Sequence, residues 1–210
     1  MAWLSPAFPT GAFAYSHGLE WAVESGDVTN EAGLHAWLKD VIAHGTGRSD
    51  TILLRHAHRA SGIPDELAVI VELATATAAG RERQAETLNQ GRAFVLAVEP
   101  WGGGDRLLAT GAVPYPVAVG AFAGLHGIPE DATAAAYLQA FASNLISAAV
   151  RLVPLGQTAG LRVLAALEPV ILATAAATAT ATLDDLGGCA LRSDLAAMHH
   201  ETQYTRLFRS

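Results

Sequence analysis

The sequence predicts an all-α protein, a single-domain helical bundle of roughly eight to ten helices. Apolar residues recur at three- and four-residue spacing through most of the 210 residues, as in helices that bury one face. Alternating runs rich in valine, isoleucine and aromatic residues, which would indicate strands, are scarce. Hydrophobic residues make up 51% of the chain and charged residues 16%, which is enough apolar material for a sizeable core. The length fits one domain over residues 1–210.

Capping residues mark where the first helices begin. Ser16 can cap a helix that ends at Gly26, because a serine side chain accepts a hydrogen bond from a free N–H at a helix start. Thr29 can cap the second helix in the same way, and Ser49 opens a third. The apolar stripe that we expect the second helix to bury is Leu34, Trp37, Leu38, Val41 and Ile42.

Proline and glycine delimit the fourth and fifth helices. The fourth begins at Pro64, which needs no helical N–H there, and Asp65 and Glu66 face the positive end of its dipole. It ends near Gly80. The fifth runs from about residue 81 to residue 98, and the glycine-rich segment 101–105 is a flexible break after it.

The middle of the chain holds the longest uncharged stretch, residues 107–129. This stretch is about as long as a membrane span, but prolines and glycines interrupt it. We therefore expect a buried helix at 116–125 with its entry loop. The longest helix of the bundle is predicted between Pro129 and Pro154, and another helix at 157–167.

Small residues and a glycine pair precede the last helix. Residues 173–182 are alanine and threonine only, and such small side chains let helices approach closely, so we place this tract in the bundle. Glycines 187–188 then break the chain. In the final helix Leu191, Leu195 and Met198 share one stripe.

Charge and composition argue against several classes of function. A net charge of −7 without a basic, aromatic stripe predicts no nucleic-acid partner. The single cysteine, Cys189, cannot form an internal disulfide, which fits the reducing cytoplasm. The N-terminus lacks a basic region and is interrupted by Pro6 and Pro9, so we expect neither a signal peptide nor a membrane partner.

The sequence also lacks the common catalytic motifs. It has no glycine-lysine phosphate loop, no GxSxG elbow and no HExxH pair, so we expect no enzyme and no cofactor. His56 and His58 together suggest a metal site. However, side chains two residues apart point to different faces of a helix, which favours a solvated helix face instead.

The N-terminal segment, residues 1–16, is suited to binding a partner. Its prolines and glycine prevent a helix, yet it carries Phe8, Phe13 and Tyr15. These rings either pack onto their own bundle or dock a partner, since exposed aromatic patches mark interfaces.

The C-terminal tail, residues 199–210, ends in apolar side chains flanked by arginines. Tyr204, Leu207 and Phe208 are out of phase with the stripe of the preceding helix, so they form a separate element. Aromatic and arginine side chains dominate interface energetics, which favours partner binding by the tail. The alternative is a tail that packs against its own domain.

Five segments, in order and at matching spacing, carry a family resemblance. Along nearly its whole length the chain resembles the urease accessory protein UreF. The segments are 5–20 (SPAFPTGAFAYSHGLE), 81–84 with 91–94 (RERQ and GRAF), 116–120 (PVAVG), 145–157 (LISAAVRLVPLGQ) and 198–210 (MHHETQYTRLFRS). Two positions depart from the family pattern: Ala12 stands where a second glycine is common, and His199 where arginine is usual.

The resemblance implies an all-helical, dimeric adaptor that is not an enzyme. Proteins of this family bridge the accessory protein UreD (also called UreH) to the GTPase UreG on the way to apo-urease, and so help to insert nickel. It implies that the N-terminal segment and the tail face UreD, and that a face with Tyr15 and Arg206 recruits UreG. The residues expected to bind partners are Phe13, Tyr15, His17, Glu20, Tyr204, Arg206, Leu207, Phe208 and Arg209.

Two alternatives from other classes remain. A nickel-binding metallochaperone could use His199, His200 and Glu201, although neighbouring side chains diverge in a helix. A helical enzyme could hold a buried polar pocket around Arg151 and Gln157. Against this, a cation at the C-terminal end of a helix suits the dipole without any further role.

Overall fold

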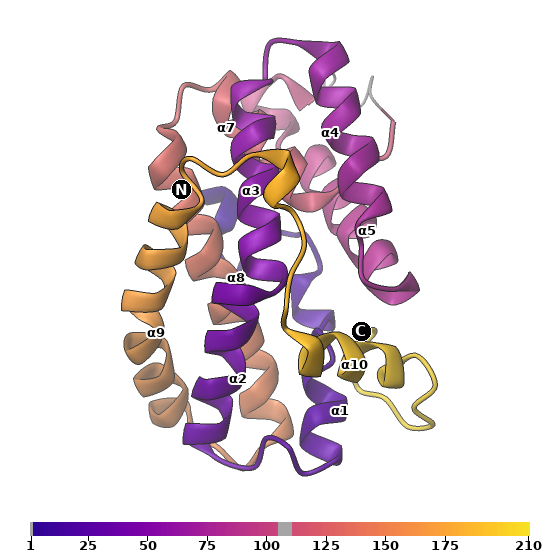
Figure 1. The fold of residues 1–210 in the computed structure, drawn as a ribbon, viewed down its shortest axis with the longest axis vertical. Coiled ribbons are helices and arrows are strands. Elements are labelled where there is room, and N and C mark those ends of the chain that lie inside the picture. The colour runs from indigo at the N-terminus through magenta and orange to yellow at the C-terminus, as the bar shows by residue number, and fades with distance from the viewer. Residues whose placement is uncertain (1, 105–110) are drawn as a thin grey trace.

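The protein, seen in a computed structural model that describes residues 2–104 and 111–210, is one bundle of helices (Figure 1). Within these residues there is no strand, so the predicted all-α class is confirmed. The helices are α1 (Leu19–Glu24), α2 (Glu31–His44), α3 (Thr46–Arg59), α4 (Pro64–Ala76), α5 (Arg81–Ala97), α7 (Tyr115–Leu125), α8 (Glu130–Leu152), α9 (Gln157–Ala177) and α10 (Leu191–His200). Parts of the predicted break at 101–105 and of the uncharged stretch fall on residues 105–110, outside the described residues.

Helix α7 is the buried helix that the uncharged stretch predicted. All its residues from 116 to 123 are buried, and it packs against α3, α5 and α8. Gly120 permits the closest contact, because a Cβ there would lie 2.1 Å from the carbonyl oxygen of Leu54 in α3. Only glycine lets the two backbones approach this closely.

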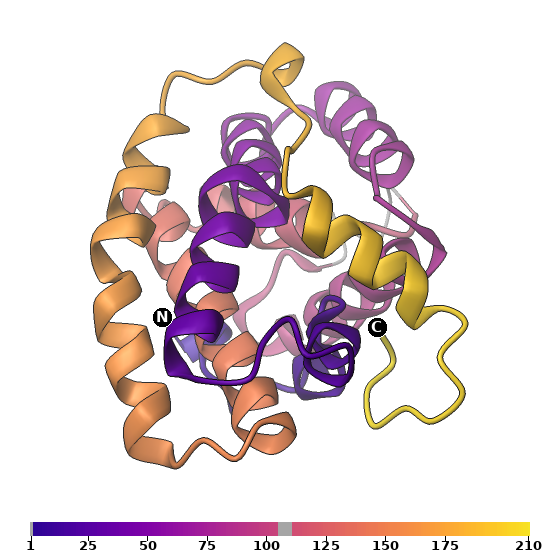
Figure 2. The ribbon, with the colours of Figure 1, turned by 60° about the horizontal axis from the view of Figure 1, so that its bottom comes forward.

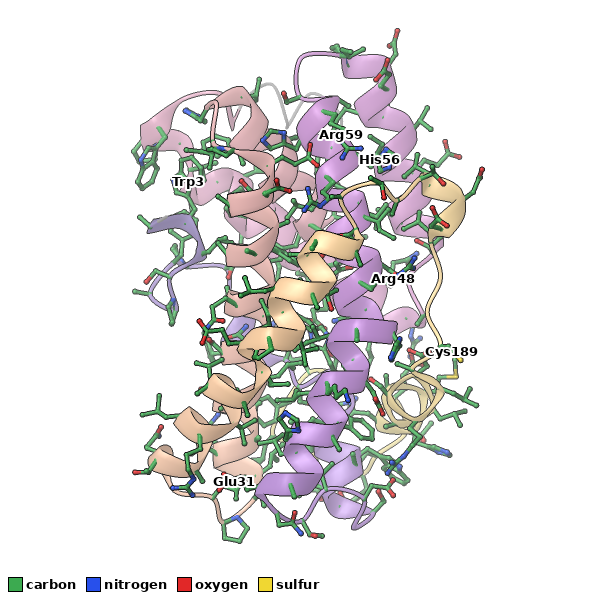
Figure 3. The ribbon with its side chains drawn as sticks, turned by 60° about the vertical axis from the view of Figure 1, so that its left-hand side comes forward. Trp3, Glu31, Arg48, His56, Arg59 and Cys189 are labelled. Atoms are coloured by element: carbon green, nitrogen blue, oxygen red, sulfur yellow. The ribbon has the colours of Figure 1, made fainter. Side chains whose placement is uncertain are left out.

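The two longest helices, α8 and α9, pack together, and α2 packs against both (Figure 3). The predicted end of α9 near Leu167 is wrong, since the helix continues through Pro169 to its last turns. Pro169 removes one backbone hydrogen bond but lies on the exposed face, while Ile171 and Thr174 beyond it are buried. The first part of the alanine-threonine tract, residues 173–177, therefore joins the bundle as the end of α9, and residues 178–182 follow it.

Helix α9 is the one helix among those described that is long and apolar enough to cross a membrane. Its buried face packs against α2 and α8, and its other face exposes Leu161 and Leu172. A core helix of a bundle meets the same length and composition criterion. Packing within the bundle accounts for this helix.

The first two helices begin close to their predicted caps. The Ser16 hydroxyl accepts a hydrogen bond from the N–H of Glu20 in α1, 3.3 Å away, but α1 ends sooner than predicted. Helix α2 is capped by Asn30 rather than Thr29, because the Asn30 side-chain oxygen accepts the N–H of Gly33 at 2.9 Å. Asparagine ranks above threonine as a helix cap, which accounts for the shift by one residue.

Helix α3 begins at Thr46, ahead of the predicted Ser49. The chain turns at Gly45, where a Cβ would lie 2.7 Å from the side chain of Ala190. Tertiary packing at this glycine, and not a capping side chain, therefore sets where α3 starts.

Arg55, Arg59 and Glu130 form a network that we call the arginine clamp. Arg55 is almost fully buried; its Nη1 lies 2.7 Å from a Glu130 carboxylate oxygen, and its Nη2 donates to the carbonyl oxygen of Ala175 at 2.7 Å. Arg59 binds the same carboxylate at 2.7 and 2.9 Å. Burial pushes the pKa of Glu130 up, but its bonds from Arg59 and Arg55 outweigh this and hold the pKa below its usual value. The clamp thus ties α3 to α8 and α9.

His56 and His58 take part in the same packing. His56 Nε2 lies 3.0 Å from the carbonyl oxygen of Ala181, and His58 Nε2 lies 2.7 Å from that of Ile128. The two rings serve different neighbours, as their spacing predicted. They do not lie on a solvated face, however, because both are partly buried. The segment that follows α9 passes beside His56 (Figure 3).

A linker runs from the end of α9 across α3 to the start of α10 (Figures 1 and 3). Arg48 donates to the carbonyl oxygen of Asp185 at 2.6 Å, and the N–H of Cys189 donates to that of His44 at 2.7 Å. The Cys189 side chain is exposed. These bonds fix the place where α10 begins.

Helix α10 packs against α1 through a close backbone contact at Gly18. Gly18 has φ of +75°, and a Cβ on it would lie 2.5 Å from the backbone nitrogen of Ala197. Both the conformation and the space require glycine. This contact presents α10 and the tail beside the start of α1.

Candidate docking surface

The tail folds back onto the N-terminal segment. Beyond α10, residues 201–210 form the yellow loop of Figures 1 and 2, which returns toward the indigo start of the chain. The N–H of Arg209 donates to the carbonyl oxygen of Ala14 at 2.8 Å, and the N–H of Ser16 donates to that of Ser210 at 2.6 Å. The two segments that the sequence separates by almost the whole chain therefore lie together.

The apolar side chains of the tail divide into buried and exposed ones. Phe208 is only 5% exposed, and the Arg151 guanidinium lies 4.3 Å from its ring centroid. Leu207 is 76% exposed and Tyr204 fully exposed. The alternative of a tail packed on its own domain thus holds for Phe208, whereas Leu207 and Tyr204 project into solvent.

The N-terminal segment is divided in the same way. Tyr15 is buried, and Phe8 is partly buried against Phe94, with ring centroids 5.7 Å apart. Phe13 is 69% exposed. Of the three rings, Phe13 is therefore the one that can touch a partner directly.

Arg151 joins the N-terminal segment to the tail. Its Nη2 donates to the carbonyl oxygen of Phe13 at 2.7 Å while its guanidinium faces the ring of Phe208. Both Arg151 and Gln157 are exposed, so the buried polar pocket expected around them for an enzyme is not formed. The sequence identified Arg151 but not this role, which depends on two segments far from it in the chain.

Helix α10 exposes the stripe that the sequence predicted. Leu191, Leu195 and Met198 are 65%, 46% and 51% exposed, while small residues and His200 fill the opposite, buried face. Sequence reasoning did not count these three residues as functional. Their spacing was the available signal, because three long apolar side chains share a face while the buried positions are mostly small. We define the docking surface as Phe13, Leu191, Leu195, Met198, Tyr204 and Leu207.

Glu20 holds the tail from its buried side. One of its carboxylate oxygens accepts the N–H of Leu207 at 2.7 Å, and the other accepts that of Phe208 at 3.0 Å. Glu20 is only 6% exposed, so it supports the docking surface and does not itself face a partner. That Glu20 takes part in partner binding stays a prediction, and its visible contacts are with the backbone of the tail.

His200 links Glu20 to a second carboxylate. His200 Nε2 lies 3.1 Å from Glu20, and its Nδ1 lies 2.7 Å from Glu82 in α5. Glu82 in turn pairs with Arg206 of the tail at 2.5 Å. The sequence had singled out three members of this chain of contacts but not Glu82, which lies within the RERQ segment of the family resemblance.

His17 belongs to a second buried network beneath the tail. It has φ of +55°, and its Nε2 lies 2.7 Å from Glu86 of α5. Glu86 also pairs with Arg83 and accepts the hydroxyl of Ser210 at 2.7 Å. Burial raises the pKa of Glu86, but Arg83 and His17 outweigh this and lower it to about 2. The pKa of His17 is lowered by its burial and by Arg83.

A cavity of about 460 Å³ lies behind the N-terminal segment. Asp50, Arg83 and Tyr137 line it, and the Tyr137 hydroxyl donates to Asp50 at 2.8 Å. Burial raises the pKa of Asp50 to about 6, although Arg83 and Tyr137 act against this shift. Tyr137 and Asp50 thus pair with each other, whereas Arg83 pairs with Glu86.

The two histidines of the tail, His199 and His200, contact different groups. His199 stacks on Trp21, with ring centroids 5.0 Å apart, whereas both nitrogens of His200 face carboxylates. Glu201 accepts the N–H of Glu82 at 3.2 Å. Across the described residues no three histidine, cysteine, aspartate or glutamate side chains lie together as metal ligands would.

The chain is similar to known urease accessory proteins. The UreF family model matches residues 28–168. A urease accessory protein UreF of Rhodopseudomonas palustris strain BisB18 is 54% identical over 217 residues, covering 100% of this chain and 90% of that protein. The UreF of Bradyrhizobium sp. strain BTAi1 is 53% identical over 216 residues, covering 100% of the chain and 90% of the relative. That of Xanthobacter autotrophicus is 54% identical, covering 100% and 89%.

Proposed function

The chain belongs to the UreF family of urease accessory proteins and so takes part in urease maturation, and from this premise we propose that it is a non-catalytic adaptor. The adaptor binds UreD (UreH) and recruits the GTPase UreG for nickel insertion into apo-urease. It works in the cytoplasm as a homodimer. These finer statements go beyond the family name, and the docking surface is the observation that supports the binding of a partner.

The docking surface suits a large apolar contact. Tyr204 and Leu207 stand in solvent on a loop whose backbone is held at Glu20, so little conformational freedom is lost when a partner covers them. Burying one such side chain contributes about 1.5–3 kcal/mol before ordering costs. The exposed stripe of α10, the helix that leads into the tail, adds further apolar area, and apolar anchors of this kind decide affinity. We assign this surface to UreD.

Arg206 is suited to a separate contact with UreG. Its side chain is 38% exposed and pairs with Glu82, so the guanidinium is held in place with donors still open to solvent. Tyr15, expected to act with Arg206, is buried and supports the surface from beneath. An arginine placed in this way can bind an acidic group on the GTPase without any catalytic role of its own.

Co-purification with UreD and UreG, each omitted in turn, tests the adaptor proposal. The sharpest variant changes Tyr204→Ser and Leu207→Ser together. Its matched control changes Leu161→Ser and Leu172→Ser on α9, which are 67% and 56% exposed but lie outside the docking surface. We expect the tail variant to lose UreD and the α9 variant to keep it. Retention of UreD by both variants would contradict the assignment.

A further inference from the structure

His200 is held in a way that a neutral imidazole cannot satisfy. It is fully buried, and each ring nitrogen contacts a carboxylate oxygen, at 2.7 Å on Glu82 and 3.1 Å on Glu20. An ionised carboxylate only accepts hydrogen bonds, and a neutral imidazole has one N–H and one bare nitrogen. With Glu20 and Glu82 both ionised, both contacts are hydrogen bonds only when both ring nitrogens carry a proton.

We propose that His200 is an imidazolium whose charge positions the tail for docking. The group of Glu20, His200, Glu82 and Arg206 is here called the tail latch. His200 is a positioning residue, since it is fully buried and touches no partner itself. The docking consequence depends on the proposed function, whereas the charge on His200 does not.

The charges of the tail latch balance only with a cationic His200. The Glu20 side chain is 7% exposed, and among the described residues His200 is the one cationic group within ion-pair distance of it. A buried carboxylate without a cation is costly. Glu82 carries two contacts, to His200 and Arg206. Two carboxylates then face two cations, whereas a neutral His200 would leave one negative charge in excess and a lone pair aimed at a carboxylate.

The latch holds the tail through the same two carboxylates that contact His200. The carboxylate of Glu20 that binds His200 also accepts the backbone N–H groups of Leu207 and Phe208. On the other side of the ring, Glu82 holds the guanidinium of Arg206. His200 therefore fixes both the backbone that presents Leu207 and the side chain that we assign to UreG.

The charge can be read directly by NMR of the full chain labelled with ¹⁵N-histidine, at neutral pH. We expect His200 to show two protonated ring nitrogens. His199, exposed and stacked on Trp21, provides an internal reference in the neighbouring position. A bare ring nitrogen on His200 would overturn the latch. This readout requires no partner protein.

The positioning role is tested with Glu20→Gln, which replaces one accepting oxygen by an NH₂ group that cannot accept. We expect faster amide exchange at Leu207 and Phe208 and UreD binding weakened about tenfold or more. His200→Gln, which can serve only one of the two carboxylates, should act in the same direction. The matched control is Asp27→Asn, which breaks an exposed pair between the α1–α2 loop and Arg192 of α10 and leaves the latch intact.

The outcomes separate the latch from the adaptor proposal. Unchanged amide exchange in both latch variants, with helix content preserved by circular dichroism, would overturn the positioning role. Faster exchange in both variants with undiminished UreD binding would leave the latch standing and remove the tail from the UreD interface. A weakened UreD complex in the latch variants but not in Asp27→Asn supports both.

Discussion

The arginine clamp and the tail latch are both networks of cations and carboxylates built around buried residues, Arg55 in the clamp and His200 in the latch, but they join different kinds of structure. The clamp uses two permanent cations to tie three helices of the bundle, α3, α8 and α9. The latch places a histidine between α1 and α5 and holds a loop. A guanidinium keeps its charge at any physiological pH, whereas an imidazole can lose its own. Permanent charge therefore secures the scaffold, and a titratable charge secures the segment that presents the docking surface.

Removing the tail should have the largest effect on function. We expect deletion of residues 204–210 to abolish co-purification with UreD while the bundle stays helical, because the deletion removes Tyr204 and Leu207 but no helix. The buried ring of Phe208 is lost as well, so a modest fall in unfolding free energy, about 1–2 kcal/mol, should accompany it. On one sample, a pull-down checks the loss of UreD, and circular dichroism checks the helix content and the unfolding free energy. An unfolded product would mean that the tail is part of the scaffold. The proposed division between a clamp for the scaffold and a latch for the docking segment would then be wrong.

Breaking the clamp should affect stability and not docking. Arg55→Ala leaves Glu130 with one cation fewer and a cavity in the core, and we expect the unfolding free energy to fall by about 3 kcal/mol. Urea denaturation measures it. Arg162→Ala, which removes an exposed pair with Glu31, is the matched control and should leave the urea midpoint unchanged. If the folded Arg55→Ala variant lost UreD binding, the clamp would also affect docking, and the two networks would not have separate roles.

Arg206→Ala should separate the two partners. The change removes a charge but little apolar area, so we expect UreD to be retained and UreG recruitment to fall about tenfold. Pull-downs with each partner on the same variant decide it. Arg162→Ala provides the control, since Arg162 is also an exposed arginine paired with a glutamate, Glu31, but lies on α9 outside the tail. Equal losses in both variants would show a general effect of removing a positive charge.

The smallest effect that we predict is on the free energy of unfolding, from a change at Asp50. Its carboxylate belongs to neither the clamp nor the latch. Its pKa is raised from 3.8 to about 6, so the folded state binds a proton that the unfolded state has released, and stability falls as pH rises between these values. We therefore expect Asp50→Asn to raise the unfolding free energy by about 1 kcal/mol near pH 8, with the gain vanishing below about pH 4. Thermal or urea unfolding across this range checks it. A loss of stability at pH 8 would mean that ionised Asp50 is favourably paired.

The sequence predicted the helices well because their signals are local. Period, proline and glycine placed α5, α7 and α8 closely and gave the start of α4 at Pro64, although α4 ends at Ala76, before the predicted Gly80. The end of α9 was missed because burial beyond Pro169 outweighs one lost hydrogen bond, and burial is a property of the assembled bundle. The stripe of α10 was recognised, but a period shows only that residues share a face, not whether a neighbour covers it.

The site was less predictable for a related reason. The tail and the N-terminal segment were both identified, yet which of their side chains point outward depends on contacts such as that of Glu20 with Phe208, made across nearly the whole chain. Sequence spacing carries no information about such pairs. His200 looked like a weak metal ligand because its carboxylate partners lie 118 and 180 positions away.

Cys189 is the chain's only thiol and is exposed two residues before Leu191, the first residue of the α10 stripe. Its backbone N–H is bonded to His44, so the attachment point is fixed although the sulfur is open to reagents. A maleimide fluorophore would therefore label the native sequence at one defined position, beside Leu191 and close to where UreD is proposed to arrive. Partner arrival could then be timed by the change in dye emission, in a protein that carries no engineered residue.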